Sequence, residues 1–138
     1  MGGTILKTAR CKEFTTPEGR QLAYDNMKKE GIDDPVLFEA IKAHNPKCGK
    51  KAKTKMEYAL LAADPMSGFV KAVAQIYPDK KIASVKHKSV MKRFNEMRFA
   101  AGANRDYMEA IEFTGLSLDD LIDVALEEMG AIADTLGL

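Results

Sequence analysis

The stretch "MEYALLAADPMSGFVKA", residues 56–72, decides the fold. Met56, Leu60, Leu61 and Phe69 recur at the spacing of one helix face, and apolar residues at this spacing indicate a helix that packs on a core. Asp64 lies on the same face, one turn after Leu60 and Leu61. An ionised carboxylate on an apolar face costs several kcal/mol unless a partner pairs with it. Asp64 is therefore the first candidate functional residue.

Length and charge limit the class of protein. The chain has 138 residues, which fits one compact domain, and 21 Lys and Arg oppose 20 Asp and Glu for a net charge of +1. This balance argues against nucleic acid or an anionic membrane as a partner. No apolar run approaches the roughly 20 residues of a membrane span, and no secretory segment precedes the two thiols, Cys11 and Cys48. We therefore expect a cytoplasmic protein with one domain over residues 1–138.

Helix signals recur on both sides of the opening stretch. Thr16 and Asp34 each precede a proline, and a capping residue followed by Pro is typical of a helix start. Thr54 and Glu57 have the spacing of a capping box. Later helices are expected to begin at Ser84 or Ser89, at Asn104, and at Ser117, where one helix would run through "LDDLIDVALEEMGAIADTLG". No sustained alternation indicates a strand, so we expect an all-α, single-domain bundle of six or seven helices.

Pro65 leaves two interpretations of Asp64 open. Proline lacks an N–H and fits the first position of a helix, so Asp64 could be an N-cap that accepts from the amide of Met66 or Ser67. Alternatively, Asp64 faces His44 at the end of the preceding helix, because helices joined by a short loop usually pack antiparallel. His44 itself could simply pack or cap carbonyl groups without any chemical role.

Few other residues could carry chemistry. His44 and His87 are the two imidazoles of the chain, so a site that needs several His ligands cannot come from one copy. The spacing His44-x-x-x-Cys48 resembles half of a zinc site, but no second pair accompanies it and we expect no zinc there. The segment "VKHKSVMKRFNEMR" is a basic cluster whose default role is a solvated surface. Its sharper interpretation is phosphate binding by Lys88, Lys92 and Arg93, with Arg105 of a later segment as a further ligand.

Three ordered segments resemble a known family. They are "EGIDDPVLFEAIKAHN" (residues 30–45), "MEYALLAADPMSGFVKAVAQIYPDKKIASVKHKSVMKRF" (56–94) and "FAAGANRDYMEAIEFTGLSLDDLIDVALEEM" (99–129). In this order they are similar to a branch of the HD-domain superfamily, the metal-dependent phosphohydrolases, over about residues 17–138. The resemblance implies a helical bundle. It also makes residues 1–14 an atypical N-terminal segment.

The resemblance further implies a metal site, of which this chain keeps a part. The last Asp of the family's site matches Asp64, and one of its His ligands matches His44. The family's adjacent His-Asp pair has no counterpart here, and the position of a further His is occupied by Glu18 and Gly19. Two ligands leave a divalent metal mostly water-bound. We therefore expect a relict, non-catalytic HD-like domain with an incomplete metal site, which acts in binding or in oligomer structure.

Two other functions stay open. The chain could be a metal-dependent phosphohydrolase for a phosphoester or nucleotide, its divalent-metal site completed by another subunit or by Glu18 and Asp25. It could instead bind a small phosphorylated ligand through the basic cluster without chemistry. Shortening at the N-terminus would expose apolar surface that the family covers, which predicts a homo-oligomer. A helix within residues 1–14 could fill part of that gap.

Overall fold

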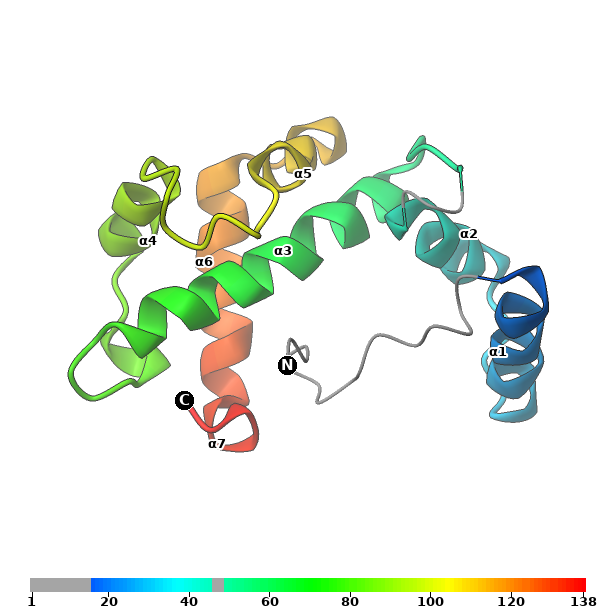
Figure 1. Ribbon diagram of the computed structural model, residues 1–138, viewed down its shortest axis with the longest axis horizontal. Helices are drawn as coiled ribbons and strands as arrows, with labels where there is room; N and C mark the ends of the chain where they lie inside the picture. Colours follow the sequence, from blue (N-terminus) through cyan, green and yellow to red (C-terminus); the bar gives the residue numbers. More distant parts are fainter. Residues whose placement is uncertain (1–15, 46–48) are drawn as a thin grey trace.

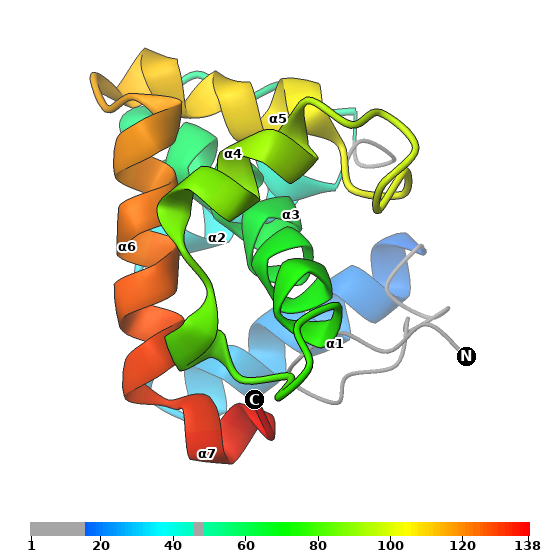
Figure 2. The same ribbon diagram turned by 90° about the vertical axis from the view of Figure 1, so that its left-hand side faces the viewer.

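The computed structural model describes residues 16–45 and 49–138 (Figures 1 and 2). Within these residues all regular structure is helical, which confirms the all-α prediction. The elements are α1 (Pro17–Lys29), α2 (Pro35–His44), α3 (Lys55–Gln75), the 3₁₀ turn η3 (Ile82–Ser84), α4 (His87–Phe94), α5 (Arg105–Glu109), the 3₁₀ turn η4 (Ala110–Thr114), α6 (Leu118–Ala131) and α7 (Ala133–Leu136). The helix predicted within residues 1–14 lies outside the described part of the chain.

Helix α3 is the axis of the fold, as its apolar stripe predicts. It crosses the molecule in Figure 1, with α1 and α2 at one end, α4 near the other end, and α5 and α6 beside its middle. Its contacts are with α2, α4, α5, α6 and both 3₁₀ turns. Of the helices in the described residues, none combines the length and apolar character that crossing a membrane requires.

The core lies between α3 and the C-terminal helices. Met66, Phe69, Val70 and Val73 of α3 are fully buried, as is Ile122 of α6. The ring of Phe69 meets the rings of Phe94 and Phe99 edge-on, with centroids 6.1 and 5.5 Å apart. Such edge-to-face pairs add to the free energy gained by burying the rings.

Most helix starts follow the predicted caps. A side-chain oxygen accepts a hydrogen bond from a backbone amide in the first turn of the helix at each of these positions: Thr16, Asp34, Thr54, Asn104 and Ser117. Thr54 with Glu57, and Ser117 with Asp120, form complete capping boxes. Caps of this kind are decided by residues within one turn, which is why sequence finds them.

The predicted cap at Ser84 or Ser89 is wrong. Helix α4 begins at His87, and its N-cap residue, Lys86, makes no side-chain capping bond. Both hydroxyl groups are used elsewhere: Ser84 Oγ donates to Asp79, and Ser89 Oγ is 2.7 Å from the Tyr77 hydroxyl. Contacts with the preceding turn therefore take the groups that could have capped the helix.

The structure also differs from the predicted helices at Pro65 and at Ile132. Helix α3 runs through Pro65 without a break, so Asp64 is not the N-cap of a second segment. Ser67 Oγ donates to the Asp64 carbonyl at 2.8 Å in this part of the helix. The last predicted helix is instead divided at Ile132 into α6 and α7, and the division lets Leu136 and Leu138 pack on the core.

Helix α1 lies beside α2. None of its side chains is buried, and its clearest anchor is the ring of Tyr24, 4.4 Å from that of Phe38 in α2. Gly31 follows the end of α1: its φ of 78° lies in the left-handed region that glycine favours, and its amide donates to the Lys28 carbonyl. This end of the molecule therefore has a small interface of its own, separate from the main core.

Candidate functional site

The structure brings His44 and Asp64 together. His44 is the last residue of α2, Asp64 lies at the middle of α3, and His44 Nε2 is 3.6 Å from Asp64 Oδ2. The two side chains are 34% and 54% exposed. Asp64 is therefore not the buried charge that its apolar neighbours suggest. It lies at the edge of the apolar face of α3, next to the end of α2.

Neither nitrogen of His44 has a hydrogen bond within the described residues. The 3.6 Å contact of Nε2 is longer than a hydrogen bond, and the buried Nδ1 has no partner there. Two ligand atoms that each lie about 2.1 Å from one tetrahedral ion are about 3.4 Å apart. The spacing of Nε2 and Oδ2 is thus close to that of two ligands of one divalent metal.

No third protein ligand joins this pair in the described residues. No group of three or more His, Cys, Asp or Glu side chains is placed there to hold a metal ion. Glu18 and Asp25 are exposed on α1, and Asp25 accepts a hydrogen bond from Gln21 at 2.9 Å. They therefore do not complete the site within one chain. Cys48 lies outside the described residues.

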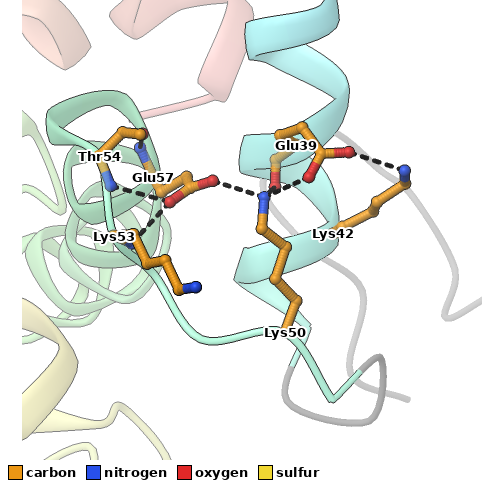
Figure 3. Close-up of polar contacts among 6 residues, drawn as sticks. All are labelled: Glu39, Lys42, Lys50, Lys53, Thr54 and Glu57. Atoms are coloured by element: carbon orange, nitrogen blue, oxygen red, sulfur yellow. Dashed lines mark hydrogen bonds and ion pairs between the residues drawn. The ribbon is translucent and has the colours of Figure 1, made fainter.

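A charged network sets the position of α2 against α3 (Figure 3). Lys50, in the loop between the helices, places its Nζ 2.6 Å from Glu57 Oε1 and 2.5 Å from Glu39 Oε2. Glu57 belongs to the first turn of α3, and Glu39 belongs to α2. The ammonium group of Lys50 thus joins α2 to α3. Because His44 lies on α2 and Asp64 on α3, the distance between them depends on this link.

Glu57 is the buried member of this network. Its side chain is 3% exposed, and it accepts hydrogen bonds from Lys50 Nζ and from the amides of Lys53 and Thr54, at 2.6, 2.6 and 2.9 Å. The hydrogen bond from Lys50, followed by those from the two amides, lowers the pKa of Glu57 to about 2. The sequence predicts the capping box but not the lysine that completes it.

His87 forms a second histidine–carboxylate cluster, which the sequence did not predict. Its Nδ1 is 2.6 Å from Asp123 Oδ1 and its Nε2 is 2.7 Å from Asp119 Oδ1. These bonds, that to Asp123 foremost, raise the pKa of His87 above its ordinary value. The carboxylates lie at opposite nitrogens of one ring, so the three groups do not converge on a point where a metal could bind. The arrangement is an ion-pair link between α4 and α6.

The predicted phosphate ligands are placed differently from one another. Lys88 and Lys92 are exposed on α4, one turn apart, whereas Arg93 bonds to Glu96 and lies over the ring of Phe99, 5.4 Å from its centroid. Like charges at this spacing repel, so an anion beside Lys88 and Lys92 would relieve the repulsion. The phosphate role of these three residues stays a prediction.

Arg105 is placed unlike a phosphate ligand. It is 9% exposed, and its guanidinium donates to five backbone carbonyls, of Phe94, Glu96, Phe99, Ala100 and Ala103. The same group stacks on the ring of Phe69, 5.0 Å from its centroid. Its donors are thus all used in holding the segment between α4 and α5, which corrects the prediction that Arg105 faces a ligand.

Comparison with known proteins gives short matches only. A segment of 38 residues is 86% identical to part of an ATP-dependent 6-phosphofructokinase 2 of Bacteroides thetaiotaomicron, and covers 28% of this chain and 12% of that enzyme. ATP-dependent 6-phosphofructokinases of Paenibacillus macquariensis and Halothermothrix orenii match over 37 residues with 58% and 61% identity, covering 27% of this chain and 12% and 11% of the enzymes. The chain thus spans about 12% of the length of these relatives. These matches do not bear on the resemblance to HD domains.

No protein-family model matches the chain. No solved structure matches it either.

Proposed function

We propose that this chain is a relict domain of the HD type that binds a divalent metal weakly and has no phosphohydrolase activity of its own. The observation that carries the proposal is the approach of His44 Nε2, at the end of α2, to Asp64 Oδ2, in the middle of α3, at 3.6 Å. One imidazole and one carboxylate suit Mn²⁺, Fe²⁺ or Zn²⁺ rather than Mg²⁺ or Ca²⁺. Solvent would occupy the remaining positions of the ion.

The absence of chemistry follows from the number of ligands. A catalytic ion activates a bound water only where protein ligands fix its position and geometry. Two half-exposed ligands allow the ion to exchange and to move. The role we propose is therefore to bind a metal that joins α2 to α3 within one chain, or to stabilise an oligomer.

Calorimetric titration with Zn²⁺ tests the proposal. We expect one weak site per chain, and in His44→Ala and Asp64→Asn an affinity at least about tenfold lower, since losing a direct ligand costs no less than losing a group that orients one. His87→Gln is the matched control and should leave the affinity unchanged. Equal affinities in the wild type and both site variants would contradict the proposal.

A second candidate is a phosphohydrolase whose metal site is completed by another subunit. The exposure of His44 and Asp64 favours it, because both side chains are open to ligands from a second chain. Hydrolysis of para-nitrophenyl phosphate with Mn²⁺ would then rise faster than linearly with protein concentration. A rate strictly proportional to concentration across the dimer transition would exclude this version.

A third candidate is a phosphate-binding module that uses Lys88 and Lys92. The exposed pair on α4 supports it. Binding of ATP should weaken with salt and should fall further in Lys88→Gln/Lys92→Gln. An affinity for ATP that does not change with ionic strength would exclude this candidate.

A further inference from the structure

A cavity of about 440 Å³ lies between α1 and α2. Side chains of both helices line it, together with Lys50 of the following loop. This volume is within the range of sites that take small organic ligands. Neither His44 nor Asp64 lines the cavity, so it is separate from the proposed metal site.

Most of the cavity wall is apolar. Tyr24 and Phe38 face one another across the two helices with ring centroids 4.4 Å apart and a tilt of 58°. The other apolar lining residues are Pro17, Ala23, Met27, Pro35 and Ile41. Two rings and several aliphatic groups around one space favour a flat, apolar ligand body.

Three cations also line the cavity, from different parts of the chain: Arg20 from α1, Lys42 from α2 and Lys50 from the loop. One lining acid, Glu39, opposes them. Lys50 is held by the buried Glu57 as well as by Glu39, as Figure 3 shows, and is committed to the α2–α3 contact. Three cationic side chains thus line the cavity beside one carboxylate.

Lys42 is the cation that a ligand can recruit. Its Nζ lies 2.8 Å from Glu39 Oε1, one turn away on the same helix, and its side chain is 55% exposed. Exposed pairs of this kind contribute little to the stability of the fold. Glu39 keeps Lys50 as a partner, so an anion at the cavity can take Lys42 at little cost.

We propose that the cavity between α1 and α2 binds a small amphipathic anion, with an aromatic body against the Tyr24 and Phe38 rings and one acidic group at Lys42. This site is additional to the His44–Asp64 pair. It also gives α1, which buries no side chain of its own, a second set of contacts in the bound state.

Fluorescence titration with 1-anilinonaphthalene-8-sulfonate tests the proposal, with the uncharged N-phenyl-1-naphthylamine as the matched probe. We expect one saturable site for the sulfonate and affinity for the neutral probe at least about tenfold lower. Raising the salt concentration should weaken the binding of the sulfonate and leave the binding of the neutral probe unchanged. Equal affinity of the two probes, or non-saturating binding of the kind that loosely packed states give, would overturn the proposal.

Two variants locate the site. Ala23→Trp fills the cavity and should abolish binding, while Lys42→Gln removes the cation and should lower the affinity for the sulfonate by about threefold to tenfold with the neutral probe unaffected. Lys81→Gln, at an exposed position next to η3 and outside the cavity lining, is the control and should change nothing. Circular dichroism and melting curves establish that each variant is folded. Unchanged sulfonate binding in the folded Lys42→Gln protein would remove Lys42 from the site.

Discussion

Arg105 shows how one side chain can organise a segment without regular structure. Its guanidinium holds five carbonyls of residues 94–103 and lies against the ring of Phe69. Hydrogen bonds from a charged donor to buried acceptors are among the stronger ones. The planar fork of arginine can reach acceptors on several sides at once, whereas the single ammonium of lysine cannot.

We therefore expect Arg105→Lys to be strongly destabilising. The free energy of unfolding should fall by about 3 kcal/mol, because several carbonyls lose their donors while the charge is kept. Urea denaturation measures the change. Arg98→Lys, at an exposed position, is the control and should change stability by less than about 0.5 kcal/mol. Equal effects of the two substitutions would refute the role given to Arg105.

Glu57 predicts an acid-sensitive step. Its pKa is about 2 in the folded chain and near 4.5 when unperturbed. A lowered pKa stabilises the fold above the unfolded value, and that stability is lost as the pH falls through the interval from about 4.5 to about 2. Thermal melts at pH 7 and pH 3 should show this loss.

The variant Glu57→Gln isolates this contribution. It should melt at a lower temperature than the wild type at pH 7, by about 5 °C, and should lose less stability between pH 7 and pH 3. Glu128→Gln, at an exposed position of α6, is the control. If the wild type and Glu57→Gln lost the same stability on acidification, the assignment of this pH dependence to Glu57 would be wrong.

At the scale of elements, two ionic links fix the helices that sequence reasoning alone leaves unplaced. Lys50 ties α2 to the start of α3, and His87 ties α4 to Asp119 and Asp123 of α6. Asp119 and Asp123 are four residues apart, so they lie on the same face of α6 and reach the imidazole from both sides.

His87 predicts a loss of stability toward alkaline pH. Its pKa is raised in the folded chain, so its contribution is fully present below the unfolded value near 6.5 and is lost as the pH rises through the higher folded value. Because the side chains are partly exposed, each pair contributes less than about 1 kcal/mol. Urea denaturation at pH 6 and pH 9 should show this small loss.

His87→Gln should flatten the difference between the two pH values without otherwise changing the fold. Asp123→Asn should reduce it in part, because Asp119 still faces the ring. A wild type and a His87→Gln variant with the same loss between pH 6 and pH 9 would show that other groups cause it.

The elements also show what sequence can predict. Caps such as Thr54 and Ser117 depend on residues three positions away, and the meeting of His44 with Asp64 depends on two neighbouring helices, so both are found from sequence. The contacts of His87 join residues 32 and 36 positions apart, and those of Arg105 are with backbone carbonyls. Neither set of contacts leaves a local pattern of side chains in the sequence. The sequence therefore does not predict the His87 cluster, and it suggests a phosphate as the partner of Arg105.

At the scale of the whole molecule, the core unites α3 with the C-terminal helices, while α1 and α2 form a smaller attachment at one end (Figure 1). Several large apolar side chains remain exposed in the described residues, including Phe113, Leu116 and Val124 at 69, 49 and 51%. Exposed apolar side chains mark an interface where they form one contiguous patch. A homo-oligomer stays our expectation for the chain.

Light scattering at micromolar concentration checks the oligomeric state. We expect a dimer or larger assembly, and a shift toward monomer in Val124→Asp, which places a charge on the exposed side of α6. Glu127→Asp, on the same helix, is the control. A monomeric wild type would refute the expectation.

The central claim is that His44 and Asp64 together bind a divalent metal. Because the chain has two histidines, a nitrogen-detected NMR titration of the ¹⁵N-labelled imidazoles with Zn²⁺ reports on each one separately. The account predicts that the His44 signals shift at low Zn²⁺ while those of His87, whose nitrogens both face carboxylates, stay in place, and that Asp64→Asn removes the shift. His44 signals that do not move, or that move equally in Asp64→Asn, would contradict it.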